Sequence, residues 1–201
     1  MYRSAGLLVV TTIATALLVA GCADPKPDAS TPESSASTAV KPATATKGTF
    51  GPYSSSARAV TYDPAVVPPG ATADVTITES DGATVVTLAT QGLLPDRVYG
   101  AHLHTKPCGE TGKAAGPHYQ HEHDPAAKAS PPSVDPSYAN PRNEVWLDLT
   151  TDAQGAGTSR STQEWTFTAK PQSLVIHAKK TETAAGKAGT AGDRVACLTI
   201  S

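Results

Sequence analysis

The sequence predicts an all-β domain built as an antiparallel sandwich or barrel. Three observations indicate this class: short runs of β-branched residues recur over residues 57–200, turn-forming residues separate them, and no stretch has a clear helical period. About seven or eight short strands with such turns between them are typical of sandwiches and barrels. The chain of 201 residues has room for one such domain and for additional segments.

Residues 1–21 have the features of a secretory signal peptide. A single charge, Arg3, precedes an apolar run from Ala5 to Ala20 that is short for a membrane-spanning helix. The run leads into Cys22 through small residues and resembles a bacterial lipobox, in which the thiol accepts diacylglycerol before cleavage. We therefore expect a lipoprotein signal peptide and a lipidated Cys22; the alternative is an ordinary signal peptide with an incidental cysteine. The anchor would hold the protein on the outer face of the cytoplasmic membrane, at a cell surface or in a periplasm.

The segment after the signal peptide, residues 22–56, consists of the lipidated cysteine and a stretch rich in Pro, Ser, Thr and Ala. This composition has almost no large apolar residue, so it cannot bury enough surface to offset the entropy lost on ordering. We expect a disordered tether here and a folded domain over residues 57–201.

The folded domain is predicted from the alternation of its residues. In residues 71–79, Val75 and Ile77 share one face of a strand while threonines lie on the other, and the Asp81-Gly82 pair that follows is a hairpin signal. The expected strands are residues 57–62, 71–79, 83–90, 98–104, 145–150, 157–167, 173–177 and 194–200.

Charge and cysteine content restrict the function further. The formal net charge is −2, becomes −3 when Arg3 is removed with the signal peptide, and includes no basic run. Nucleic-acid binding needs a clustered positive surface, so no nucleic-acid partner is expected. Of the three cysteines, Cys108 and Cys197 remain as a pair if Cys22 is lipidated, and an exported protein is expected to join them in a disulfide. Nothing in the sequence predicts an oligomeric state.

Histidines mark the candidate site. Two loops, residues 105–143 and 181–193, are much longer than usual, and each follows a strand that carries histidine, which favours a functional role. Imidazole is the commonest metal ligand among side chains. His102 and His104 alternate with Leu103, so period-two geometry directs both imidazoles to one face of the strand and Leu103 to the other. All six histidines are His102, His104, His118, His121, His123 and His177.

The ordered set of motifs resembles the copper/zinc superoxide dismutase family over about residues 57–201. Its most specific parts are the His-x-His strand, the Gly-Pro-His turn that ends at His118, and the closing Gly-x-Arg-x-Ala-Cys of residues 192–197. The resemblance implies an eight-stranded antiparallel Greek-key β-barrel, sandwich-like, with two long functional loops. It also implies that the copper ligands are His102, His104, His118 and His177.

The resemblance assigns further roles. Cys108 and Cys197 correspond to the intrachain disulfide of the family, and Arg194 corresponds to the arginine beside the copper that receives the anionic substrate. His118 corresponds to the ligand that bridges copper and zinc and carries a proton during the reaction. The substrate implied is superoxide, converted to oxygen and hydrogen peroxide by copper redox cycling.

The sequence departs from the family at the zinc ligands. Counted forward from His118, those positions hold Ala126, Asp135 and Tyr138, and counted backward from the next strand the last two become Arg142 and Val145. Thr181 stands where the family has an aspartate that links copper and zinc ligands. We therefore expect a copper-only member whose zinc function is lost or substituted.

Two features of this region stay open in the sequence. A metal-bound histidine normally has a partner for its outer nitrogen. The carboxylates available to His118 are Glu122, Asp124, Asp135 and Glu144. The stretch His121-Glu122-His123-Asp124 is either an auxiliary metal-capture or unconventional zinc site, or a polar surface loop, and the loop is the favoured interpretation.

The leading hypothesis is thus a lipid-anchored, extracytoplasmic superoxide dismutase that depends on copper. The alternative is a copper-binding or buffering lipoprotein on the same fold with little turnover, and a purely structural surface domain is a third. Arg194 favours catalysis, because a copper carrier does not need an arginine that receives an anion.

Overall fold

The structure, a computed structural model, describes residues 43–128 and 131–200. The chain divides into two units, and all described residues lie in the second, Ser37–Ser201. The expected signal peptide of residues 1–21 and Cys22 lie outside the described residues, so what was predicted of them stays a prediction. No helix in the described part of the chain is both long and apolar enough to cross a membrane.

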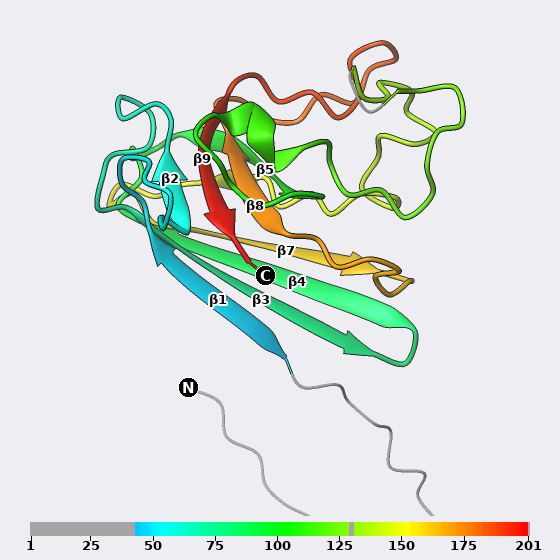
Figure 1. The fold of residues 1–201 in the computed structure, drawn as a ribbon, viewed down its shortest axis with the longest axis horizontal. Helices are drawn as coiled ribbons and strands as arrows, with labels where there is room; N and C mark the ends of the chain where they lie inside the picture. The colour runs from blue at the N-terminus through cyan, green and yellow to red at the C-terminus, as the bar shows by residue number, and fades with distance from the viewer. Residues whose placement is uncertain (1–42, 129–130, 201) are drawn as a thin grey trace, which may run out of the picture. The chain divides into compact units, whose positions relative to one another are not determined.

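The described residues form nine β-strands in two antiparallel sheets that lie one above the other in Figure 1. The first sheet has the order β1-β3-β4-β7, formed by Thr44–Thr49, Thr72–Ser80, Ala83–Gln91 and Gly157–Gln163. The second has the order β2-β9-β8-β5-β6, formed by Ala59–Thr61, Arg194–Thr199, Ser173–His177, Val98–His104 and Leu149–Thr150. The all-β, antiparallel, sandwich-like fold class is therefore confirmed.

The hydrophobic core is made by both sheets. Val86 and Leu88 of β4 contribute from the first sheet, and Leu103 of β5, Leu174 of β8 and Leu198 of β9 contribute from the second; all are at most 1 % exposed. Burial of such side chains stabilises the fold by about 1.5–3 kcal/mol each. One face of the five-stranded sheet therefore packs in the core, and side chains on its opposite face are available to form a functional site.

Several strand boundaries differ from those expected. The predicted tether is wrong in its last part, because Thr44–Thr49 forms β1 and pairs with β3 along its whole length. Small residues allow this strand to pack: a side chain at Gly48 would meet Leu198 Cδ1 at 2.5 Å. The expected strand 145–150 is reduced to β6, and residues 145–148 make only an isolated bridge, from Trp146 to His102. The short 3-10 helix η1, Gly112–Ala115, lies in the first long loop.

Candidate metal centre

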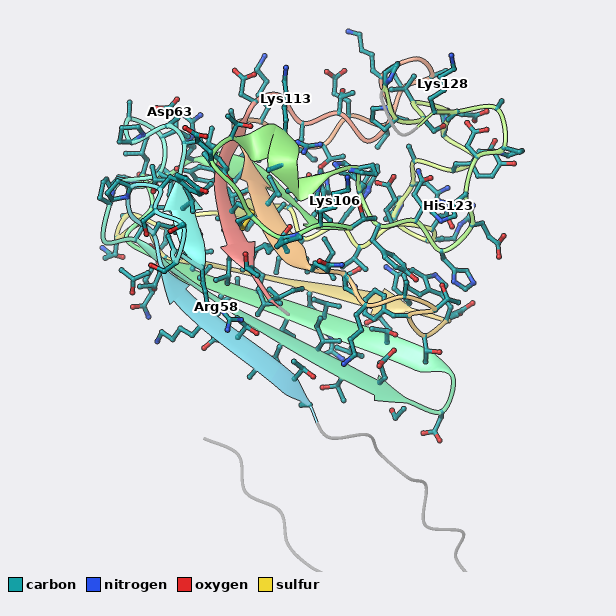
Figure 2. All side chains as sticks on the ribbon, in the orientation of Figure 1. Arg58, Asp63, Lys106, Lys113, His123 and Lys128 are labelled. Atoms are coloured by element: carbon teal, nitrogen blue, oxygen red, sulfur yellow. A yellow bond between two sulfur atoms is a disulfide. The ribbon has the colours of Figure 1, made fainter. Side chains whose placement is uncertain are left out.

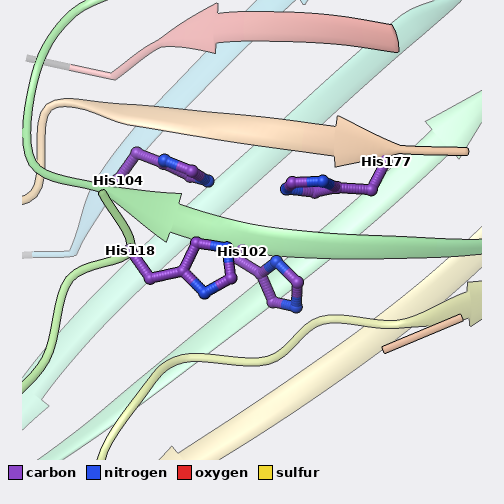
Figure 3. Close-up of side chains that lie close together, drawn as sticks. All are labelled: His102, His104, His118 and His177. Carbon is purple, nitrogen blue, oxygen red and sulfur yellow. The ribbon is translucent and has the colours of Figure 1, made fainter. Parts of the chain in front are cut away.

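Four imidazoles meet on the outer face of the five-stranded sheet (Figure 3). One ring nitrogen from each of His102, His104, His118 and His177 lies within 4.8 Å of the others, and among the described residues this is the one group of His, Cys, Asp and Glu that could hold a metal ion. The structure thus brings together the four residues that the sequence predicted as copper ligands.

The sheet register explains why three of them meet. His102 and His104 lie on one face of β5, and Leu103 between them is buried in the core, as expected. β8 is the neighbouring strand, and its register pairs Gly100 with His177, so the His177 side chain emerges on the same face. His118 arrives from the loop after η1 and is held against β5 by a backbone bridge to His104.

Hydrogen bonds leave one nitrogen of each imidazole available. His104 Nδ1 and His177 Nδ1 bond to the carbonyl oxygens of Gly116 and Gly192, at 3.0 and 3.4 Å. Among the described residues, His102 Nδ1, His104 Nε2 and His177 Nε2 are buried and have no hydrogen-bond partner. Such atoms are rare in proteins and need an explanation, and a shared metal ion supplies one. The donor set of four nitrogens suits copper, including tetragonal Cu(II).

The environment keeps the imidazoles of His102, His104 and His177 neutral. Burial lowers the pKa of His102 and of His104 well below the usual range, and the neighbouring His118 lowers both further. Burial, followed by the proximity of His118, lowers the pKa of His177 to about 3. A neutral imidazole is the form that binds a metal, so protons compete weakly for this site at neutral pH.

Of the four carboxylates that the sequence left possible, Glu144 is the hydrogen-bond partner of His118. Its side chain is 2 % exposed, and Oε2 lies 2.9 Å from His118 Nδ1. Oε2 also accepts a hydrogen bond from Trp146 Nε1 at 2.7 Å, and Oε1 accepts one from Gln120 Nε2 at 2.8 Å. Trp146 and Gln120 were not identified in the sequence, because they lie outside the strands, in isolated bridges, and single residues there carry no distinguishing signal.

The other three carboxylates have different surroundings. The side chain of Glu122 is 77 % exposed. Asp124 accepts a hydrogen bond from the Ser133 hydroxyl, and Asp135 accepts one from the backbone N–H of Ser137, so both stabilise turns of the loop.

The stretch from His121 to Asp124 matches the polar-loop interpretation. The His121 ring stacks on Trp165, with centroids 4.8 Å apart and an interplanar angle of 4°. His123 is exposed and lies on the same loop as Lys128, away from the four-stranded sheet (Figure 2). Neither histidine belongs to the one metal-capable group found in the described part of the chain.

Arg194 reaches the site through an irregularity of the sheet. Ile176 pairs with Ala196, but His177 pairs with Arg194, so the register shifts where a regular ladder would place Val195 opposite His177. Such bulges redirect side chains and are common next to active sites. Arg194 lies, with His118 and His177, in the wall of a cavity of about 420 Å³. Burial lowers the pKa of its guanidinium from the usual value, which still leaves the group protonated at neutral pH.

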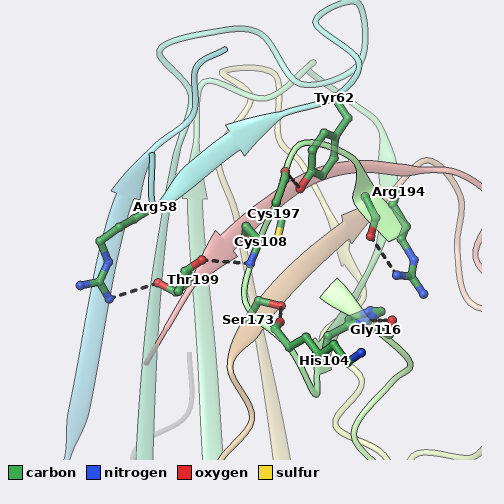
Figure 4. Close-up of a disulfide and its surroundings, with 12 residues drawn as sticks. Arg58, Tyr62, His104, Cys108, Gly116, Ser173, Arg194, Cys197 and Thr199 are labelled. Carbon is green, nitrogen blue, oxygen red and sulfur yellow. Dashed lines mark hydrogen bonds between the residues drawn. A yellow bond between two sulfur atoms is a disulfide. The ribbon is translucent and has the colours of Figure 1, made fainter. Parts of the chain in front are cut away.

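A disulfide supports this arginine (Figure 4). Cys108 and Cys197 are bonded, as predicted, and join the segment before η1 to β9. Arg194 Nη1 donates a hydrogen bond to the carbonyl oxygen of Gly112 at 2.9 Å. The loop attached by the disulfide therefore also holds the arginine side chain.

The fold and the site together define the class of this protein: an antiparallel β-sandwich with a buried four-histidine centre and an arginine in the cavity above it. The family model of copper/zinc superoxide dismutase (SODC) matches residues 71–200, and the chain belongs to this family. Family membership supports superoxide dismutase activity in general.

One solved structure supports the fold. The Cu/Zn superoxide dismutase from Brucella abortus is 20 % identical and aligns over 78 % of this chain and 99 % of its own, with a TM-score of 0.50. The P104H mutant of a SOD-like protein from Bacillus subtilis is 19 % identical over 64 % of this chain and 88 % of its own, with a TM-score of 0.46. Comparison with curated protein sequences gives no match.

Proposed function

We propose that this protein is an extracytoplasmic superoxide dismutase that uses copper without zinc and is anchored to the membrane through Cys22. The observation that carries the proposal is the combination of buried, unpartnered imidazole nitrogens with an arginine that lies, with His118 and His177, in the wall of one cavity. Copper held by His102, His104, His118 and His177 would supply the one-electron redox chemistry that converts superoxide to oxygen and hydrogen peroxide.

The chain's own residues provide substrate binding and a proton. Arg194 offers a permanent positive charge and several hydrogen-bond donors to a small anion entering the cavity. His118 is the most accessible of the four imidazoles, with 13 % of its side chain exposed, and carries a hydrogen bond from Nδ1 to Glu144. We therefore assign to His118 the transfer of a proton to the reduced anion.

The copper-only part of the proposal rests on Glu144. A zinc ion shared with the copper site would need the outer nitrogen of His118, and that nitrogen lies 2.9 Å from a carboxylate oxygen instead. The carboxylate orients the imidazole and supplies negative charge, which are two of the roles of a carboxylate behind a metal-bound histidine.

The membrane anchor and the location outside the cytoplasm rest on the sequence of residues 1–22. A disulfide between Cys108 and Cys197 agrees with an oxidising compartment. Superoxide is charged and crosses lipid poorly, which gives an enzyme on the outer face a substrate of its own to remove. A copper-binding or buffering lipoprotein is the second candidate, and it leaves the placement of Arg194 without a use.

Copper loading and substitution of Arg194 test the proposal. The protein carrying Cys22→Ser, exported so that the disulfide forms, is loaded with copper alone, and its metal content and superoxide dismutation are measured. We expect activity with copper and no zinc.

Arg194→Ala should retain copper but lower kcat/KM at least 10-fold and flatten its salt dependence, because steering by charge contributes about 10- to 1000-fold to association. Arg160→Ala, an exposed arginine on β7, is the matched control and should change neither. Copper binding without dismutation would favour the buffering protein, and stoichiometric zinc in the native protein would contradict the copper-only proposal.

A further inference from the structure

Thr181 and Asp148 form a short hydrogen-bond chain behind His102. His102 Nε2 lies 2.7 Å from Thr181 Oγ1, and Thr181 Oγ1 lies 2.6 Å from Asp148 Oδ1. The direct separation of His102 Nε2 from Asp148 Oδ1 is 3.8 Å, which is too long for a hydrogen bond, so the hydroxyl mediates between imidazole and carboxylate. Asp148 comes from the segment before β6, and Thr181 from the loop after β8.

The chemistry of the three groups fixes the direction of the hydrogen bonds. An ionised carboxylate only accepts, so the single hydroxyl hydrogen of Thr181 is donated to Asp148. The Thr181 oxygen is then an acceptor toward His102, and the imidazole must carry its hydrogen on Nε2. His102 Nδ1 is buried and has no hydrogen-bond partner among the described residues. The buried Nδ1 is therefore a free acceptor.

The surroundings hold this chain rigidly. Asp148 Oδ2 accepts the backbone N–H of Thr181 at 2.8 Å, and Oδ1 accepts the backbone N–H of Ala101 at 3.3 Å. Thr181 is 5 % exposed. A side chain at Gly100 would meet Lys179 O at 2.6 Å and Thr181 Oγ1 at 3.2 Å, so a glycine is required for the loop to approach β5 this closely. One carboxylate thus fixes both the hydroxyl and the backbone of residue 181.

The other histidines of the sheet have the opposite arrangement. His104 and His177 bond to backbone carbonyl oxygens through Nδ1, which leaves Nε2 unpartnered. His102 and His104 project from one face of one strand, two residues apart, and bring one nitrogen each to the same point. They do so with different ring nitrogens, Nδ1 from the first and Nε2 from the second, so their tautomers have to differ.

We infer that Thr181 and Asp148 are positioning residues that hold His102 in its Nε2–H tautomer and so present Nδ1 to the metal. This inference rests on the metal binding in the proposed function, but it concerns a property that the metal-free protein already has. Removal of the hydroxyl would allow the Nδ1–H tautomer, which directs a hydrogen at the metal position. Loss of such a partner typically lowers metal affinity about 10- to 100-fold.

The experiment reads the tautomer directly. Long-range 1H–15N correlation spectra of the metal-free protein distinguish Nε2–H from Nδ1–H histidine, and His104 and His177 serve as internal references. We expect Nε2–H at His102 in the wild type and in Thr181→Ser, which retains a hydroxyl. Thr181→Val should lose this preference and bind copper about 10- to 100-fold more weakly. Thr190→Val is the control, because this hydroxyl in the same loop bonds to Lys187 O.

The inference is overturned if folded Thr181→Val keeps the wild-type tautomer of His102 and binds copper within twofold of the wild type. It is also overturned if the wild type itself has the Nδ1–H form. Both results are independent of dismutation, so failure of the enzymatic proposal is seen separately, as copper binding without activity.

Discussion

Replacement of Glu144 by glutamine tests whether a buried carboxylate substitutes for zinc. In the wild type, Oε2 accepts hydrogen bonds from His118 and Trp146, and Oε1 accepts one from Gln120. A glutamine that places its oxygen at the Oε2 position keeps the first two bonds, and the amide of Gln120 can turn its oxygen toward the new NH2 group. The substitution therefore preserves the shape of the site and removes one negative charge.

The substitution Glu144→Gln should weaken copper binding much more than it changes the free energy of unfolding. Loss of the carboxylate behind a metal ligand costs about 10- to 100-fold in affinity, equivalent to about 1.4–2.8 kcal/mol. In the metal-free protein, Glu144 is 2 % exposed, and its one ion-pair partner among the described residues is His118, which is charged only when protonated. A buried carboxylate without a full countercharge is costly, and this offsets the weaker hydrogen bonds of the amide. We expect the free energy of unfolding without metal to change by less than about 1 kcal/mol.

Competition titration with a copper chelator and denaturant unfolding of the metal-free protein measure the two quantities. Glu182→Gln is the matched control, because this glutamate is 49 % exposed and pairs at the surface with Lys187. Wild-type copper affinity in Glu144→Gln would refute the reasoning. A large loss of metal-free stability would also contradict it, because the carboxylate would then be primarily a folding group.

Two further predictions concern stability. The pKa values of His102, His104 and His177 are lowered from 6.5 in the folded protein, that of His177 to about 3. The unfolded state therefore binds more protons below about pH 6.5, and stability is lost as the pH falls further. The loss without metal should reach about 1.4 kcal/mol per pH unit for each of the three histidines, and a profile that stays flat between pH 7 and 5 in denaturant titrations would contradict it. Replacing Cys108 and Cys197 by serine opens a loop of 89 residues, and should lower the free energy of unfolding by about 4–5 kcal/mol; a melting temperature close to that of the wild type would disprove this.

The strands that carry the site were predictable from the sequence, because their two faces differ in chemistry. Residues 98–104 and 173–177 were expected as strands and are observed as β5 and β8 with the same bounds. The first strand was not predictable, because Thr44–Thr49 contains no large apolar residue and its composition resembles that of the preceding segment. This strand forms because it pairs with β3, and a contact between distant segments leaves no pattern in the local sequence.

The four histidines were predictable from the sequence, whereas the groups that hydrogen-bond to their outer nitrogens were not. The four histidines stand in motifs whose order is distinctive, and the structure brings all four together. Glu144 is 26 residues from His118, and Asp148 is 33 residues from Thr181. Sequence offered four carboxylates for His118 and none for His102, because hydrogen bonds between distant loops depend on how those loops pack and have no local pattern.

In the metal site, packing in the core fixes the positions of the ligands on the five-stranded sheet, and the loops set the hydrogen bonds to their outer nitrogens. β5 places Leu103 in the core and His102 and His104 on the outer face, so the positions of these ligands are fixed by the same packing that stabilises the fold. The hydrogen bonds to their outer nitrogens come from loops: Gly116 behind His104, and Thr181 with Asp148 behind His102. Because tautomer and local charge are set by these loops, they can change without moving the ligand positions. In the copper-only function proposed above, Glu144 takes the place of a zinc ligand set behind His118, so the metal preference of the site is decided in the loops and not in the strands.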